Sequence, residues 1–286
     1  MLKKGQVIKV ISGFFDVKTK DNLVYRLRGS GSLRTKKLLP IVGDYVLFKE
    51  DLILCEIEKR NSYLIRPKVA NVDQVVIVMS LSQPSFSYIL LDKFLAIIQY
   101  QELDVIIVFT KMDLGDNKPY FDYLSQGFKC FLINNLLKNE NFIDLKNELK
   151  NKLNVFTGQS GVGKTSLLNN LLNLNEKTND ISLALGRGKH TTRVVEIFEL
   201  DDIKIIDTPG FGKFDLELTK SQLSTSFFDF KIWSKKCKFI SCLHFKEEDC
   251  EVKRQYQNGS LLKTRYENYI KMLMEAGYTH FTEIFL

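Results

Sequence analysis

One stretch, VFTGQSGVGKTSLL at residues 155–168, constrains the fold more than any other part of the chain. Its apolar start predicts a β-strand, and the residues after its glycine-rich middle predict the beginning of a helix. Gly158 and the later Gly163-Lys164-Thr165 match the G-x-x-x-x-G-K-[ST] pattern, in which backbone N–H groups cradle polyphosphate oxygens. A flexible turn between strand and helix, the simpler alternative, needs neither the lysine nor the hydroxyl. The stretch therefore predicts a phosphate-binding loop in an α/β domain.

Two side chains beside this loop are expected to supply its charge chemistry. Lys164 would place its ammonium group near the β- and γ-phosphates, and the Thr165 hydroxyl would bind Mg²⁺. The helix that starts near Lys164 would add the partial positive charge of its amino-terminal end. The loop residues expected to contact the nucleotide are Gly158, Gln159, Ser160, Gly161, Val162, Gly163, Lys164, Thr165 and Ser166.

The length of 286 residues and the hydrophobic content of 44% suffice for two domains, at least one of them with a full core. No apolar run reaches the roughly 18 residues of a membrane span, and the first residues, MLKKGQVIKVISGFFD, lack the features of a signal peptide. We therefore predict a cytoplasmic protein with no membrane partner. Disulfides are rare in that compartment, so metal binding is the role to test for the five cysteines.

Positive charge is concentrated at the amino end. Residues 1–68 hold 15 lysines and arginines against 7 acidic residues, whereas residues 69–286 hold 26 against 27. Such an excess is typical of a surface that binds a polyanion such as nucleic acid, but a basic solvated face has the same composition.

Short alternating segments fill residues 6–66, namely QVIKVISGFFDVKT, LVYRLRG, VGDYVLFKE and LILCEIEKR. Their period of two, and the turn residues between them, predict a small antiparallel barrel of the oligonucleotide-binding (OB) type. A basic loop at residues 29–37, GSGSLRTKK, joins two of these strands. It is either a contact for a phosphate backbone or an ordinary surface loop.

Beyond Pro67 the pattern changes to strands that alternate with helices, which predicts a parallel α/β sheet. The expected strands are NVDQVVIVMS, LDVIIVFT, the strand that leads into the phosphate loop, VVEIFEL and IKIIDTPG. The expected helices are LLDKFLAIIQY, IDLKNELKNKL and the helix that follows the phosphate loop.

Two tetrapeptides at strand ends complete a nucleotide site. In Asp207-Thr208-Pro209-Gly210, the Asp207 carboxylate would reach the Mg²⁺ shell and the Gly210 N–H would meet the γ-phosphate; a plain type II turn is the alternative. In Thr110-Lys111-Met112-Asp113, Asp113 would accept hydrogen bonds from guanine N1–H and N2–H₂, a donor pair that adenine lacks. The Lys111 stem would pack on the base and ribose.

The order of these motifs is unusual. An ordinary Ras-like GTPase has the phosphate loop first and the guanine-reading [NT]-K-x-D segment last, but here residues 110–113 precede residues 158–166 and 207–210. This order predicts a circular permutation, in which a helix at about residues 143–153 joins the former last strand to the former first one.

Residues 185–193, LGRGKHTTR, lie between the phosphate loop and Asp207 and combine glycines with basic side chains and two threonines. Thr191 or Thr192 is placed to be the switch threonine that completes Mg²⁺ coordination when GTP is bound. A basic solvated loop is the alternative.

A further motif, CKFISCLHFKEEDC, contains Cys237, Cys242, His244 and Cys250 in a C-x₄-C-x-H-x₅-C spacing. Four such ligands in a short segment predict a closed tetrahedral zinc site, which holds one Zn²⁺ and folds a segment too short to bury a core of its own. Coincidental cysteines in a helical tail are the alternative. The following VKRQYQNGSLLKTRYENYIKMLMEAG is expected to be an amphipathic helical segment.

Together these motifs resemble the ribosome small-subunit-dependent GTPase (RsgA) family of bacteria, through GQSGVGKTSLLN, GRGKHTT, DTPGFG, the amino-terminal barrel and the Cys/His segment. The resemblance covers nearly the whole chain. It implies an OB-fold RNA-binding domain at residues 1–67, a circularly permuted GTPase domain at residues 68–222 and a mostly helical zinc-binding domain at residues 223–286.

The function that the resemblance implies is hydrolysis of GTP to GDP by a protein that docks on the 30S ribosomal subunit, with its 16S rRNA, late in maturation. Hydrolysis would be stimulated by the subunit and coupled to release, and we expect a monomer. The alternative is a non-hydrolysing, nucleotide-switched assembly factor that binds RNA. A permuted GTPase that acts on another RNA or on a membrane is a third possibility.

The chain departs from the family pattern in two places. Thr110 stands where the family usually has asparagine, and Asn134-Asn135 follow Ile133 where a base-contacting Ser-Ala is usual. Phe211 follows the DTPG segment and cannot orient a water molecule as the glutamine of Ras-like enzymes does. The resemblance gives that catalytic role to His190; a histidine that only caps its loop is the alternative.

Overall fold

The computed structural model of the chain describes residues 2–31, 39–65, 67–135, 140–172, 195–207 and 218–276. It divides into two compact units, each assembled from segments that are distant in sequence. The first unit comprises Met1–Val76, Ile143–Thr157 and Lys164–Pro209, and the second comprises Ile77–Phe142, Gly158–Gly163 and Gly210–Leu286. No helix within the described ranges has the length and apolar character needed to cross a membrane.

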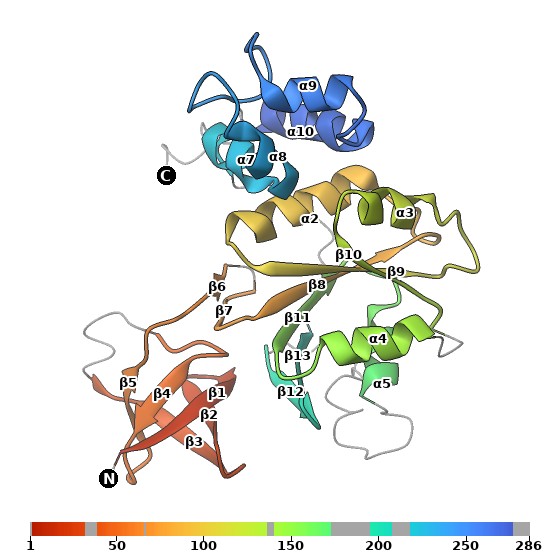
Figure 1. Ribbon diagram of the computed structural model, residues 1–286. Coiled ribbons are helices and arrows are strands. Elements are labelled where there is room, and N and C mark those ends of the chain that lie inside the picture. Colours follow the sequence, from red (N-terminus) through yellow and green to blue (C-terminus); the bar gives the residue numbers. More distant parts are fainter. Residues whose placement is uncertain are drawn as a thin grey trace. The chain divides into compact units, whose positions relative to one another are not determined.

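The amino-terminal strands of the first unit form a closed barrel in the order β1-β2-β3-β5-β4 (Figure 1). The strands are β1 (Lys3–Ile11), β2 (Phe14–Thr19), β3 (Val24–Gly29), β4 (Tyr45–Phe48) and β5 (Ile53–Ile57). Alternate side chains point inward and form the barrel core: Val7, Phe15, Val17, Leu27, Val46, Phe48 and Leu54. Closure leaves no free sheet edge. The predicted OB-type barrel is confirmed, although one of its pairs, β3 with β5, is parallel and not antiparallel as predicted.

A six-stranded sheet has the strand order β10-β9-β8-β11-β13-β12. Its strands are β8 (Gln74–Ser80), β9 (Asp104–Thr110), β10 (Lys129–Ile133), β11 (Leu153–Gly158), β12 (Ile197–Leu200) and β13 (Ile203–Asp207). β10 pairs with β9 in parallel, and β11 pairs with β13 in parallel. β8 and β11 are buried along their whole length, as strands of a covered parallel sheet must be.

The edge strand β12 differs from the all-parallel prediction because it pairs with β13 antiparallel. Only Asp201 and Asp202 separate the two strands, and Asp201 has a φ of 54°. Such a tight turn makes a hairpin, whereas a parallel pair needs a crossover of about a dozen residues or more.

Helices α4 and α5 precede and follow β11 in the sequence. Helix α4 (Glu140–Glu148) ends earlier than predicted, since Leu153 already starts β11 and Asn151, between them, has a φ of 58°. Helix α5 (Lys164–Leu171) begins at the predicted residue. A short hairpin, β6 (Tyr63–Leu64) with β7 (Val69–Ala70), brackets the Pro67 boundary.

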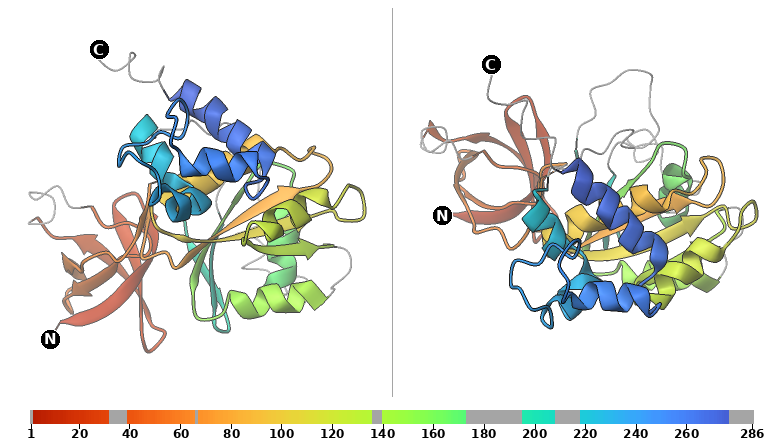
Figure 2. Two further views of the ribbon diagram at one scale, coloured as in Figure 1. Left: turned by 45° about the horizontal axis from the view of Figure 1, so that its top comes forward. Right: turned by 90° about the horizontal axis from the view of Figure 1, so that it is seen from above.

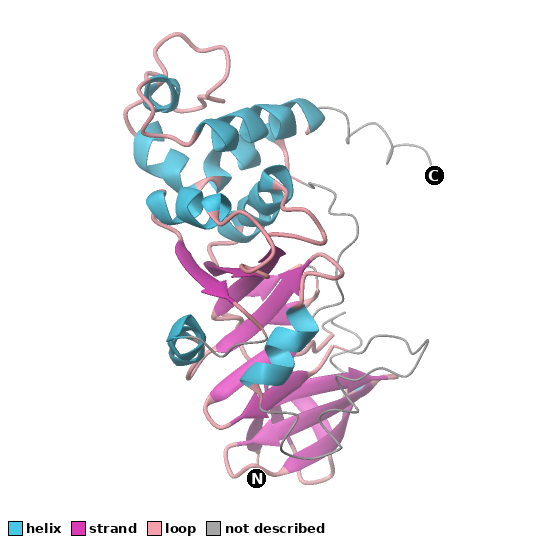
Figure 3. Cartoon of the chain, turned by 90° about the vertical axis from the view of Figure 1, so that its right-hand side faces the viewer, coloured by secondary structure: helices cyan, strands magenta, loops and turns pink. Residues whose placement is uncertain are grey.

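The second unit contains α2 (Tyr88–Tyr100) and α3 (Lys118–Ser125), and then the helices of the carboxyl-terminal region. These are α7 (Lys220–Ser226), α8 (Phe228–Ser234), α9 (Glu251–Gln257) and α10 (Lys263–Glu275). Figure 1 labels them next to α2, and Figure 3 shows a group of helices, in cyan, packed together. The predicted amphipathic segment is therefore two helices, which separate near Gly259, where φ is 82°. α10 lies beside α2 in both views of Figure 2, and Lys93 on α2 pairs with Glu275 on α10 at 2.7 Å.

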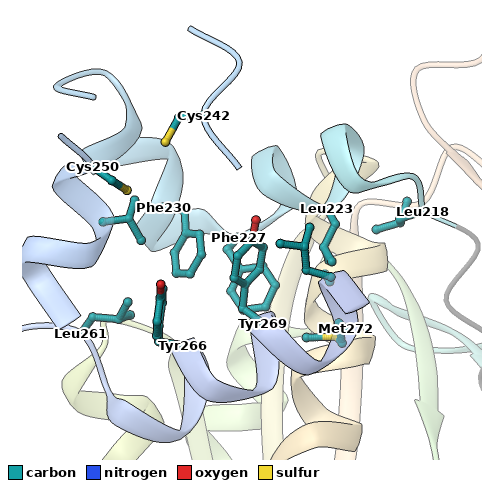
Figure 4. Packing of buried hydrophobic residues seen from close by; sticks show 13 residues of the cluster. Leu218, Leu223, Phe227, Phe230, Cys242, Cys250, Leu261, Tyr266, Tyr269 and Met272 are labelled. Carbon is teal, nitrogen blue, oxygen red and sulfur yellow. The ribbon is translucent and has the colours of Figure 1, made fainter. Parts of the chain in front are cut away.

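Aromatic side chains fill the core of this helical region. The rings of Phe227, Phe230 and Tyr269 lie together, with centroids 4.8 to 5.4 Å apart (Figure 4). Leu223 and Met272 cover them from α7 and α10. The same core includes Cys242 and Cys250, so the cysteine segment packs directly on the helices.

Candidate nucleotide and metal sites

The phosphate loop leaves β11 at Gly158, where only a glycine fits. A Cβ atom on Gly158 would lie 2.3 Å from the Val78 carbonyl oxygen on β8. Gly161 and Gly163 have φ values of 81° and 88°, in the left-handed region that glycine adopts without strain. Backbone geometry therefore accounts for all three glycines of the motif.

Thr110 and Lys111 at the end of β9 contact the outer side of this loop. The Thr110 hydroxyl is buried and donates to the Val162 carbonyl oxygen at 2.5 Å. The Lys111 ammonium group donates to the Gly161 carbonyl oxygen at 3.0 Å and also to the Gln83 carbonyl oxygen. The structure thus brings the predicted 110–113 segment and the phosphate loop together.

The rest of this segment forms an exposed turn. Lys111 has a φ of 58°, and the Leu114 N–H donates to the Lys111 carbonyl oxygen at 3.0 Å. The turn leaves Asp113 exposed, with Met112 half-buried beside it. An exposed carboxylate on a fixed turn is available to a base.

Asn135, after β10, makes a third contact with the loop that the sequence did not reveal. Its side-chain amide donates to the Gly163 carbonyl oxygen at 3.2 Å. The only signal in the sequence is that Asn134-Asn135 follow a strand that ends at Ile133. Nothing in that pattern says which way either amide points.

Lys164 and Asp207 lie together in the first unit, as the two motifs predict. Their side chains form an ion pair, and both are largely buried, with 8% and 13% of the side chain exposed. Lys164 is the first residue of α5 and Asp207 the last residue of β13, whose parallel partner β11 leads into the loop. Thr165 is half-buried, and Ser166, Ser160 and Gly161 are exposed.

Several predicted residues lie outside the described ranges. They are His190, Thr191 and Thr192 in the 185–193 loop, Gly210 in the DTPG segment, and most of the basic loop at 29–37.

The four predicted metal ligands converge in the carboxyl-terminal region. The ligand atoms of Cys237, Cys242, His244 and Cys250 all lie within 4.8 Å of one another. The Nδ1 atom of His244 is 3.7 Å from the Cys237 sulfur and 3.4 Å from the Cys250 sulfur, and these two sulfurs are 3.9 Å apart.

These separations fit a tetrahedral metal ion. With metal–sulfur bonds of about 2.3 Å and metal–nitrogen bonds of about 2.0 Å, tetrahedral angles place ligand atoms roughly 3.5 Å (S to N) and 3.8 Å (S to S) apart. Without a cation, burial raises the pKa of Cys242 to about 12 and also raises the pKa of Cys250. A bound cation reverses such shifts because it stabilises thiolates. The group can therefore hold one metal ion.

Hydrogen bonds fix the backbone around this cluster. Tyr266 and Tyr269 on α10 donate their hydroxyls to the carbonyl oxygens of His244 and Leu243, at 2.8 and 2.6 Å. The Glu247 carboxylate accepts from the N–H groups of Leu243 and Phe245. The cluster is thus held by α10 and by its own turn.

Two known domain families match the sequence of this chain. The RsgA GTPase domain matches residues 57–217, and the RsgA N-terminal domain matches residues 4–52. The chain belongs to the RsgA GTPase family. Because members of this family hydrolyse GTP, the chain is a GTP hydrolase.

Relatives of this RsgA-family chain match it over nearly its full length. The small ribosomal subunit biogenesis GTPase RsgA of Mesomycoplasma hyopneumoniae (strain J) is 46% identical over 277 residues, which cover 94% of this chain and 97% of the relative. RsgA of Bacillus subtilis (strain 168) is 38% identical over 291 residues, covering 96% and 97%.

Two solved structures share its architecture. YloQ, a circularly permuted GTPase, has a TM-score of 0.79 at 33% identity, with 97% of this chain and 96% of YloQ covered. YjeQ from Thermotoga maritima has a TM-score of 0.82 at 29% identity, with 97% and 99% covered. The predicted permuted GTPase fold is confirmed.

Proposed function

We propose that this chain binds the 30S ribosomal subunit and assists its late maturation, with GTP hydrolysis stimulated by the subunit and coupled to release. The observation that carries the proposal is the near full-length match to small ribosomal subunit biogenesis GTPases. The closed OB-type barrel and the excess of lysine and arginine in residues 1–68 support contact with 16S rRNA. A role in the cytoplasm as a monomer belongs to the same proposal.

Residues 158–166 would bind the phosphates of GTP. Lys164 now pairs with Asp207. When GTP and Mg²⁺ bind, Lys164 would turn to the β- and γ-phosphates, while Asp207 and the Thr165 hydroxyl would take part in the Mg²⁺ shell. Lys164 would thus exchange Asp207 for the phosphates. Its largely buried ammonium group would then have a negatively charged partner both with and without nucleotide.

Guanine would be read by residues 110–113. The exposed Asp113 carboxylate would accept hydrogen bonds from the N1–H and N2–H₂ groups of the base. Lys111 and Met112 would flank the base, and Thr110 would hold the phosphate loop behind it.

The catalytic and switch roles rest on the family pattern. His190 would orient the attacking water, Thr191 or Thr192 would complete the Mg²⁺ shell, and the Gly210 N–H would sense the γ-phosphate. Zn²⁺ is the ion that best suits three cysteines and one histidine in tetrahedral spacing, and one ion per chain would hold the 237–250 segment.

The three-domain division at residues 1–67, 68–222 and 223–286 is retained as part of this proposal. It assigns the RNA-binding, nucleotide-binding and metal-binding roles to separate stretches of the chain. The non-hydrolysing alternative loses its support, because the family is one of GTP hydrolases.

The experiment is phosphate release from GTP and from ATP, each measured with and without purified 30S subunits. We expect turnover of GTP alone, slow for the free protein and faster with the subunit. Turnover that does not change when 30S subunits are added would contradict the proposed coupling.

A further inference from the structure

Three successive carbonyl groups of the phosphate loop are held from its outer side. The Gly161 oxygen accepts from Lys111 at 3.0 Å, the Val162 oxygen from Thr110 at 2.5 Å, and the Gly163 oxygen from the Asn135 amide at 3.2 Å. The three donors come from the ends of β9 and β10, which pair in parallel. The loop backbone is therefore fixed at consecutive peptide groups.

A fixed carbonyl also fixes the N–H of the next residue. In a planar trans peptide the C=O of one residue and the N–H of the next point in opposite directions. Holding the oxygens of Val162 and Gly163 outward turns the N–H groups of Gly163 and Lys164 toward the inner side of the loop. Lys164 is the first residue of α5, so this N–H lies at the amino-terminal end of that helix.

We propose that Asn135 is a positioning residue for the β-phosphate of the bound guanine nucleotide, acting through the Gly163–Lys164 peptide group. This proposal rests on the proposed nucleotide site and deepens it. By holding the Gly163 oxygen, the Asn135 amide aims the Lys164 N–H at the phosphate before the nucleotide arrives. Preorganised donors bind more tightly than donors that must first be ordered.

Thr110 cannot perform this task for Gly163. A hydroxyl carries a single hydrogen, and that of Thr110 already lies between two carbonyl oxygens, Val162 at 2.5 Å and Met79 at 3.3 Å. The next carbonyl along the loop therefore needs a donor from another strand. The asparagine amide after β10 supplies it.

Gly163 makes room for that amide. A Cβ atom built on Gly163 would lie 2.9 Å from the Asn135 amide nitrogen, closer than side chains tolerate. Gly163 also has a φ of 88°, which other residues avoid. Because Gly163 has no side chain, the Asn135 amide can reach the backbone of the phosphate loop.

The test compares affinities for GDP and GMP, because GMP lacks the β-phosphate. In Asn135→Ala we expect GDP affinity to fall about three- to tenfold, the scale of one neutral hydrogen bond, with GMP affinity nearly unchanged. Asn135→Asp keeps the shape but removes the donor and adds negative charge, so its GDP affinity should fall further.

Asn141→Ala is the matched control. The Asn141 amide also donates to a backbone carbonyl of this region, that of Leu132 at 3.1 Å, but it does not contact the loop. It should leave the GDP-to-GMP affinity ratio at the wild-type value.

Equal losses for GDP and GMP in Asn135→Ala would overturn the proposal, since they would show general damage to the site. An unchanged ratio with unchanged affinities would overturn it as well. Both outcomes leave the proposed function standing as long as the wild-type chain binds GDP and hydrolyses GTP. A wild-type chain that binds no guanine nucleotide would instead contradict the proposed function itself.

Discussion

Arg265 carries a positive charge at a fully buried position, and six other side chains stabilise that charge. The guanidinium group is fully buried. It donates two hydrogen bonds of 2.9 Å to Asp229 and one of 2.6 Å to Asp92. Asn268 and Tyr123 also donate to Asp92.

Burial alone would lower the pKa of Arg265, but Asp229 and Asp92 raise it above its ordinary value. Phe128 and Phe227 lie against its face, with ring centroids 4.8 Å away.

Arg265→Met should therefore destabilise the helical region strongly. Removing one member of a buried charge network leaves the other charges uncompensated, which costs about 3–5 kcal/mol. The single tryptophan, Trp233, packs on the core of this region, so its fluorescence during urea unfolding reports the change directly.

Arg254→Ala is the comparison for this prediction. Its ion pair with Glu251 is 3.2 Å long but exposed on the arginine side, and exposed pairs contribute about 1 kcal/mol or less. A loss of stability in Arg265→Met no greater than in Arg254→Ala would contradict the account of the buried network.

Asp113→Asn should shift nucleotide preference from GTP toward xanthosine triphosphate. The substitution replaces the acceptor that matches guanine N1–H and N2–H₂ by an amide, which suits the carbonyl that xanthine has in place of the amino group. Competition binding of the two nucleotides measures the shift. If the variant still selects GTP as the wild-type does, Asp113 does not contact the base.

The longer helices and strands were predictable because their apolar residues repeat with a clear period. β8, β9 and β11 are buried apolar runs, and α5 begins at the lysine where the phosphate-loop pattern places it. The shorter α3, β10, α7 and α8 were not assigned individually, since five to eight residues give too little periodicity.

Contacts between distant segments were not predictable where no motif marks the residues. Asn135 lies 28 residues from Gly163, and Arg265 lies 173 residues from Asp92. The four metal ligands were predictable. Their spacing lies within one short segment, and their chemistry alone indicates that the side chains converge.

The metal-binding segment should contain one zinc ion per chain, and Cys242→Ser should unfold it locally. The ligand cluster is tied to α10 through Tyr266 and Tyr269, so loss of the ion should expose the aromatic core beside it. Metal analysis of protein purified without chelator gives the stoichiometry, and Trp233 fluorescence gives the local unfolding. GDP binding should persist in the variant. Protein that contains no zinc would overturn the assignment.

Residues 208–236 connect Asp207, at the end of β13, to the first metal ligand at Cys237. If Gly210 senses the γ-phosphate as proposed, nucleotide state can act on the metal-binding region by a covalent route. GTP should then favour the docked form of the protein on the 30S subunit, and loss of the γ-phosphate should weaken docking. Because attachment to RNA depends on phosphate neutralisation, docking should also weaken steeply as salt rises.

His190→Ala separates docking from catalysis in this scheme. The variant should still bind 30S subunits with a non-hydrolysable GTP analogue, because the histidine is proposed to orient water and not to hold RNA. Its subunit-stimulated turnover should fall by on the order of a hundredfold, the usual scale for a positioned acid, base or water-orienting group. Binding and turnover are measured side by side on the same preparation.

Each result of this experiment bears on a different part of the scheme. Normal stimulated turnover in His190→Ala would exclude the histidine as the catalytic residue and leave docking intact. Equal docking of the wild-type chain with GDP and with the analogue would exclude the nucleotide switch, whatever the variant does. Retained docking together with lost turnover in His190→Ala would confirm that the histidine acts in catalysis and does not hold the subunit, while tighter docking of the wild-type chain with the analogue than with GDP would confirm the switch.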